Sequence, residues 1–207
     1  MLTITIKQGK EKALLAGQHW IYASAVERVD GKPAEKNKPG ATAVVQSSSR
    51  QFLARAAYNA KSQIVGRIWS LDANEPVDHA LIKRRVQTAL ARRAEQKRWP
   101  GQLLRLVDAE ADGLPGLIVE RYEHYLICRF EAAGVDAWKV AIVQALLAGT
   151  DCPHVYERGD ELVRKAEGLP VVARALAGEE PPDEVVVTDN GQRFGMDLKT
   201  GRQRRLA

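Results

Sequence analysis

Two cysteines are the side chains in this sequence best suited to nucleophilic chemistry. Cys128 lies in an apolar run typical of a buried strand, whereas Cys152 stands between Asp151 and Pro153 at a strand entry, a more exposed setting. A reactive thiolate needs a nearby base, cation or helix N-terminus, and neither position shows one. Their spacing fits neither a disulfide framework nor a zinc site. We therefore predict two packing residues and no catalytic residue.

Carboxylates alternate at Asp108, Glu110 and Asp112. In an extended segment this spacing would place three carboxylates on one face, as a magnesium site requires. Asp112-Gly113 is a turn former, however, which favours surface positions for the two carboxylates before it. The four histidines are scattered and no two have ligand spacing on one element: His19, His79, His124 and His154. We predict no metal site.

Lysines gather around a glycine near the N-terminus. Lys7, Lys10 and Lys12 surround Gly9, and a glycine lets a phosphate approach the backbone closely. We expect RNA contact here. Two residues could extend it by stacking on an unpaired base, His19 and Trp20, and three by pairing with phosphates, Arg50, Arg55 and Arg67. The alternatives are a core position for the tryptophan and simple solvation for the arginines.

Charge is distributed unevenly along the 207 residues, whose formal net charge is +5. Residues 1–72 carry 11 Lys and Arg against 5 Asp and Glu, whereas residues 101–192 carry 8 against 17. A basic front half favours a polyanionic partner, because each cation placed on a phosphate releases counterions. The alternative is that the lysines only keep a small domain in solution.

The spacing of apolar and turn residues predicts two domains and a hairpin. Short strands at 2–7, 19–26, 41–46, 52–58 and 64–69, a helix at 10–16 and a loop at 31–40 predict a barrel-like sheet. A helix from Pro76 to about Trp99 then bridges to strands at 103–107, 117–122, 125–130 and 154–158 and a helix at 136–147. A hairpin at 185–198 and a tail at 199–207 without a partner element follow. The fold class is α+β, with domains at 1–72 and 73–184 and the hairpin and tail at 185–207.

No stretch of the sequence approaches the roughly 20 apolar residues that span a bilayer. The N-terminal residues alternate like a strand and lack the basic and apolar segments of a secretory signal. We therefore expect a soluble, cytoplasmic chain.

Three blocks of sequence resemble a known family. Residues 7–26, KQGKEKALLAGQHWIYASAV, resemble the start of a PUA domain, an RNA-binding pseudo-barrel. Residues 105–122, RLVDAEADGLPGLIVERY, and the YERGD, VRK and EGL segments of residues 156–169 are similar to the central domain of the ribosomal large-subunit RNA cytosine-5 methyltransferases. The resemblance spans nearly the whole chain. It implies a PUA-like pseudo-barrel, a small α+β central domain and ribosomal RNA as partner.

The resemblance also implies S-adenosylmethionine as cofactor of the full-length family, bound by a methyltransferase domain that supplies the attacking cysteine. In the family that domain follows a Lys-Thr-Gly segment, whereas Lys199-Thr200-Gly201 here is followed by RQRRLA. We therefore expect a truncated or frameshifted member with no cofactor-binding residues of its own. Two alternatives stay open: a protein-interaction or homodimerisation module, and an enzyme active only with a complementing methyltransferase subunit.

Overall fold

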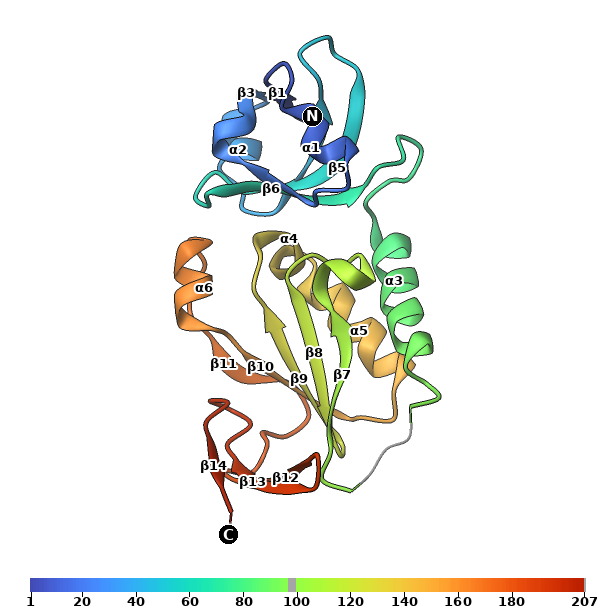
Figure 1. Ribbon diagram of the computed structural model, residues 1–207, viewed down its shortest axis with the longest axis vertical. Helices are drawn as coiled ribbons and strands as arrows, with labels where there is room; N and C mark the ends of the chain where they lie inside the picture. Colours follow the sequence, from blue (N-terminus) through green and yellow to red (C-terminus); the bar gives the residue numbers. More distant parts are fainter. Residues whose placement is uncertain (97–99, 207) are drawn as a thin grey trace.

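The computed structural model describes residues 1–96 and 100–206. An N-terminal domain sits on one end of a larger central domain, and a small third sheet lies at the opposite end (Figure 1). No helix among these residues is long and apolar enough to cross a membrane.

The N-terminal domain is built on a six-stranded sheet of order β2-β6-β5-β4-β1-β3. Its strands are β1 (Leu2–Ile6), β2 (Trp20–Tyr22), β3 (Val26–Asp30), β4 (Ala41–Gln46), β5 (Phe52–Tyr58) and β6 (Ile64–Ser70). The first and fourth strands pair in parallel, and the other pairs are antiparallel. Alternating apolar side chains, including Ile4, Ile21, Val45 and Ile68, form the core of this domain.

Two predictions for this domain are wrong. The single strand expected at 19–26 is divided into β2 and β3 by the 3-10 turn η1 (Ala23–Ala25). The expected loop at 31–40 contains a short helix, α2 (Pro33–Lys36). Pro33 is preset for a first helical turn, and the Glu35 carboxylate accepts the Lys32 backbone N–H at 3.1 Å. The helix α1 (Glu11–Leu15) lies where the sequence predicts it.

The bridging helix α3 runs over His79–Arg92. It begins later than the predicted Pro76, because the Asp78 carboxylate caps it by accepting the Leu81 backbone N–H at 2.9 Å. Its predicted end near Trp99 lies outside the described residues, although the α-helix already ends at Arg92.

The central domain has a five-stranded sheet of order β11-β10-β9-β8-β7. The strands are β7 (Leu103–Asp108), β8 (Leu117–Tyr122), β9 (Tyr125–Phe130), β10 (His154–Arg158) and β11 (Ala173–Ala177). Three further helices are α4 (Ala133–Ala137), α5 (Lys139–Gly149) and α6 (Glu161–Ala166), and η2 (Ala109–Asp112) follows β7. The helix predicted at 136–147 is thus two helices, and α6 and β11 were not expected.

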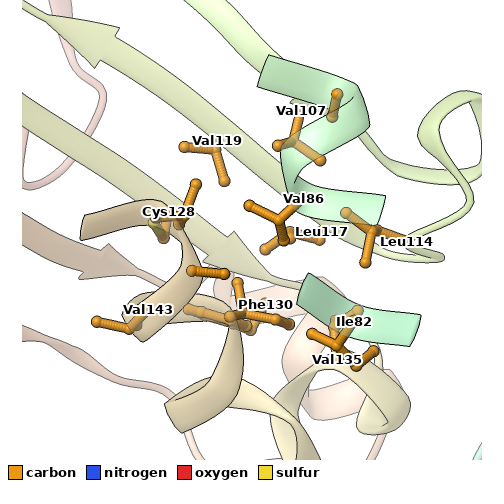
Figure 2. Packing of buried hydrophobic residues seen from close by; sticks show 14 of the residues in the cluster. Ile82, Val86, Val107, Leu114, Leu117, Val119, Cys128, Phe130, Val135 and Val143 are labelled. Carbon is orange, nitrogen blue, oxygen red and sulfur yellow. The ribbon is translucent and has the colours of Figure 1, made fainter. Parts of the chain in front are cut away.

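Apolar side chains of α3 and α5 pack on one face of this sheet. Figure 2 shows Ile82 and Val86 of α3 against Leu117, Val119 and Phe130 of β8 and β9. The opposite face is covered in part by a three-stranded sheet of β12 (Val185–Asp189), β13 (Gln192–Met196) and β14 (Gln203–Arg205). The tail was predicted to have no partner, but β14 pairs with β13. Four side chains of this region join Ile127 and Tyr156 in one cluster: Val185, Val187, Met196 and Leu198.

The two domains share apolar contacts as well as a linker. Ala57 and Trp69 belong to the N-terminal sheet, yet they pack in the core of the central domain with Val135. A Cβ on Gly134 would come within 2.5 Å of the Ala57 Cβ. The contact between the domains is therefore too close to admit a side chain at that position.

Candidate functional site

The predicted basic residues near the N-terminus lie on the connection from β1 to α1. Lys7, Gly9, Lys10 and Lys12 are exposed. Gly9 has φ +84°, and a Cβ built there would meet nothing within 4 Å. The Lys7 ammonium donates to the Ser24 carbonyl at 2.9 Å, which ties this connection to the one after β2. A ligand can therefore approach the backbone at Gly9 without obstruction.

Arg50 lies at the same end of the sheet. Because β1 runs parallel to β4, with Thr5 opposite Gln46, both strands end on one side of the domain. Arg50 follows β4 in the tight turn to β5 and has φ +65°. We call the group of Lys7, Gly9, Lys10, Lys12 and Arg50 the basic end. None of its four cations forms an ion pair with an Asp or Glu among the described residues.

Two exposed aromatic rings adjoin the basic end. Lys10, Trp20 and Tyr22 line one shallow hollow beside α1. The two rings lie edge to face with their centroids 6.5 Å apart, and the residues are 37% and 41% exposed. The interpretation of Trp20 as a core residue is wrong, because Ile21 between them is the residue that points inward. Tyr22 was missed, although its spacing of two from Trp20 in a strand indicates the same face.

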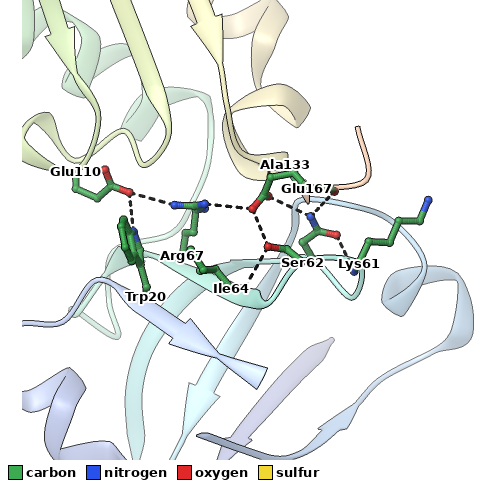
Figure 3. Close-up of polar contacts among 9 residues, drawn as sticks. Trp20, Lys61, Ser62, Ile64, Arg67, Glu110, Ala133 and Glu167 are labelled. Carbon is green, nitrogen blue, oxygen red and sulfur yellow. Dashed lines mark hydrogen bonds and ion pairs between the residues drawn. The ribbon is translucent and has the colours of Figure 1, made fainter. Parts of the chain in front are cut away.

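Arg67 lies at the boundary between the domains. Its guanidinium carbon is 5.4 Å from the centroid of the Trp20 ring. Its nitrogens pair with Glu110 at 3.4 Å and with Glu167 at 3.1 Å (Figure 3). Glu110 also accepts the Trp20 indole N–H at 2.8 Å. Both carboxylates come from the central domain, so the arginine and the tryptophan link the two domains.

Glu167 is the centre of this contact and is 4% exposed. Its carboxylate accepts hydrogen bonds from the Asn59 amide at 3.1 Å, the Ser62 hydroxyl at 2.8 Å and the Ala133 backbone N–H at 3.3 Å, besides its pair with Arg67. We call Asn59, Ser62, Arg67, Glu110 and Glu167 the domain seam. A buried carboxylate with this many donors is a fixed structural contact.

The three alternating carboxylates do not share a face. Asp108 pairs with Arg105, Glu110 with Arg67, and Asp112 with Arg92 and Arg93. They diverge because η2 is helical where an extended segment would have aligned them. Burial alone would raise the pKa of Asp112, but hydrogen bonds from Arg93 and the Asp108 backbone N–H lower it on balance. No group of His, Cys, Asp and Glu among the described residues could hold a metal ion.

The remaining predicted site residues have mixed settings. Arg55 is half-buried and donates to the Ala73 carbonyl at 2.8 Å, so it lies toward the linker. His19 is exposed and lines a cleft between the domains.

Cys128 is fully buried, and burial raises the pKa of its thiol far above the usual value. Cys152 was expected to be the more exposed cysteine, but it is only 2% exposed, because it lies in the core beneath the end of α5.

Comparison with known proteins identifies the N-terminal region. Residues 4–71 match the PUA-like domain family. Over 206 residues the chain is 37% identical to a protein of Aliivibrio fischeri named ribosomal RNA large subunit methyltransferase I, covering 98% of this chain and 50% of the relative. A Vibrio parahaemolyticus protein of the same name is 38% identical over 202 residues, or 49% of its length. The chain thus spans about half the length of the curated relatives it matches.

The fold has also been seen before. A solved structure described as a putative SAM-dependent methyltransferase from Streptococcus mutans superimposes with a TM-score of 0.76 at 17% identity, over 98% of this chain and 50% of that one. At this identity the likeness concerns the fold. The predicted mixed α and β class with a PUA-like domain is therefore confirmed.

Proposed function

We propose that this chain binds RNA through the basic end. The observation that carries the proposal is a set of four cations without carboxylate partners among the described residues. Three lie around an open glycine beside two exposed aromatic rings, and Arg50 lies at the same end of the sheet. Phosphates pair with such cations, and unpaired bases stack on such rings. The PUA-like match over residues 4–71 supports this function for the same domain.

The RNA is proposed to be ribosomal. The relatives' name, ribosomal RNA large subunit methyltransferase I, supports ribosomal RNA of the large subunit as the partner. The chain would then act in rRNA methylation in the cytoplasm, with S-adenosylmethionine as methyl donor and cytosine carbon 5 as acceptor. Because the alignment covers about half of each relative, these properties of the whole protein are proposals for this chain. The expected truncation stays a prediction.

The predicted RNA contacts divide into two groups. The first group is placed to meet RNA at the surface: Lys7, Gly9, Lys10, Lys12, Arg50, His19 and the exposed part of the Trp20 ring. The second group, Arg55 and Arg67, lies toward the linker and the domain seam. Arg67 is 13% exposed in its side chain and has two carboxylate partners, so we propose that it holds the domains together and contacts no phosphate.

The proposal is tested by measuring binding of a structured fragment of large-subunit ribosomal RNA to the purified chain at increasing salt. The variant K7E/K10E/K12E should bind at least about tenfold more weakly. The slope of log affinity against log salt concentration should be smaller in magnitude than that of wild type by about two to three. The matched control K32E/K36E/K38E makes the same charge change in the same domain, around α2. It should keep most of the affinity.

Equal weakening by the two triple variants would mean that net charge alone attracts RNA. Equally weak binding by wild type and both variants, without salt dependence, would exclude RNA as the partner and favour the protein-interaction alternative.

A further inference from the structure

A cleft of about 410 Å³ lies beside the domain seam. It is bounded by His19 and the end of β6 on one side, and by the turn after η2 and the side of α3 on the other. Six of its lining residues carry the argument: His19, Trp69, Leu71, Asp72, Arg85 and Pro115. Clefts at domain boundaries with volumes of about 300–1,000 Å³ are the usual setting of sites for small ligands.

The cleft is continuous with the proposed RNA surface. His19 directly precedes Trp20, whose ring borders the hollow that Lys10 and Tyr22 line. The Trp20 indole in turn donates to Glu110, a residue that also lines the cleft. The cleft is therefore within reach of an RNA strand that is held at the basic end and contacts the aromatic pair.

The charges in the cleft favour a base over a phosphate. Arg85 donates to the Gly113 carbonyl at 2.6 Å and shares Glu75 with Arg84, so these three residues keep one positive charge. Glu110 shares Arg67 with Glu167, so these three residues keep one negative charge, which offsets the first group. Asp72 is exposed and forms no ion pair among the described residues. Its Oδ1 accepts the Asn74 backbone N–H at 2.8 Å, and carboxylate oxygens can each accept more than one bond. An unbalanced carboxylate repels a phosphodiester but accepts the N–H groups of a base edge.

The rest of the lining fits the faces of a base. Leu71 is 59% exposed at the cleft, and Pro115 and the buried Trp69 complete an apolar wall. Protein recognition of RNA commonly takes an unpaired base out of its stack and places it between apolar or aromatic side chains, with its edge hydrogen-bonded.

We propose that this cleft binds one unpaired nucleobase of an RNA strand held at the basic end, with Asp72 accepting from an amino group of that base. This inference rests on the proposed RNA-binding function. It assigns recognition of a base to the boundary between the domains, whereas the basic end contacts the backbone. Cytosine has an amino group at carbon 4, whereas uracil has a carbonyl there and its edge N–H lies between two carbonyl oxygens that repel a carboxylate. A carboxylate acceptor therefore favours cytosine over uracil.

The test compares fluorescein-labelled oligo(C) and oligo(U) dodecamers by anisotropy. Wild type should bind oligo(C) about tenfold more tightly than oligo(U), the size of one base contact. L71W should fill the cleft and weaken oligo(C) binding about tenfold. The matched control V140W adds the same side chain at a residue that is 71% exposed on α5 and should leave binding unchanged. D72A should remove the preference for oligo(C), because it removes the acceptor without enlarging the side chain.

The two proposals fail separately. If K7E/K10E/K12E loses both oligomers while L71W binds like V140W, or D72A keeps the preference for oligo(C), the cleft inference is overturned and RNA binding stands. If wild type binds neither dodecamer in a salt-dependent manner, the proposed function is overturned and the inference with it.

Discussion

The basic end and the domain seam use the same kind of residue in opposite ways. The cations of both belong to the N-terminal domain and lie on loops or strands of one sheet. At the basic end, the lysines have no carboxylate partner among the described residues. At the seam, Arg67 is held by Glu110 and Glu167. A cation is available to a phosphate only where the fold leaves it unpaired, so the count of positive charges overstates the binding surface.

Two glycines sharpen the comparison, because their backbones are alike and their surroundings differ. Gly9 at the basic end has φ +84° and nothing near its Cβ direction. Gly40 has φ +79°, and a Cβ there would come within 2.2 Å of the Ala133 carbonyl oxygen of the central domain. The first glycine leaves room for a ligand, and the second permits contact between domains.

The largest expected effect is at the centre of the seam. E167A should lower the free energy of unfolding by about 4 kcal/mol, because it leaves Arg67 partly unpaired and the Ser62 hydroxyl and Ala133 N–H without their acceptor. Urea denaturation measures this loss. The control E161A removes a carboxylate that is 65% exposed and, among the described residues, pairs with Lys165 alone, and it should change stability by less than about 1 kcal/mol. Equal losses in the two variants would contradict the role given to the seam.

The glycine pair gives the next effect. G40A should cost about 3 kcal/mol, from left-handed backbone strain plus displacement of Ala133, whereas G9A should cost about 1 kcal/mol from strain alone. The difference in urea midpoints between the two variants reports the contact between domains. If G9A were as costly as G40A, the basic end would not be an open surface.

A smaller, pH-dependent effect is expected at Asp112. Its folded-state pKa is lowered, so its stabilisation is fully present above the ordinary pKa of an aspartate and is lost as pH falls through the lowered value. D112N should therefore cost about 2 kcal/mol at pH 7, and the difference from wild type should shrink below about pH 4. D108N is the control, because the pair of Asp108 with Arg105 is about half exposed and should contribute little at any pH. A difference that stays constant with pH would contradict the assignment.

Most strands could be predicted from sequence because their buried residues alternate or form apolar runs, as in β1 and β9. The missed elements lack that signal. Strand β11 reads ARALA, without a β-branched residue, β14 reads QRR, and α6 has six residues. These elements exist because neighbouring strands and the buried Arg164 hold them, which is a tertiary effect.

The candidate site, like the fold, was predictable only where its residues are close together in the sequence. The lysines around Gly9 could be found because charge and a glycine are visible in the chain itself. The partners of Arg67 could not, because Glu110 and Glu167 lie 43 and 100 residues further along. The extended spacing assumed for Asp108, Glu110 and Asp112 also failed, because the η2 turn that separates them is set by contacts with α3.

Lysine footprinting tests the central claim most directly. The chain is treated briefly with an acetylating reagent, with and without a ribosomal RNA fragment, and modification at each lysine is quantified by mass spectrometry. RNA should protect Lys7, Lys10 and Lys12 and leave Lys32, Lys38 and Lys165 as reactive as before. Equal protection of all exposed lysines, or protection of the second set alone, would contradict the assignment of RNA binding to the basic end.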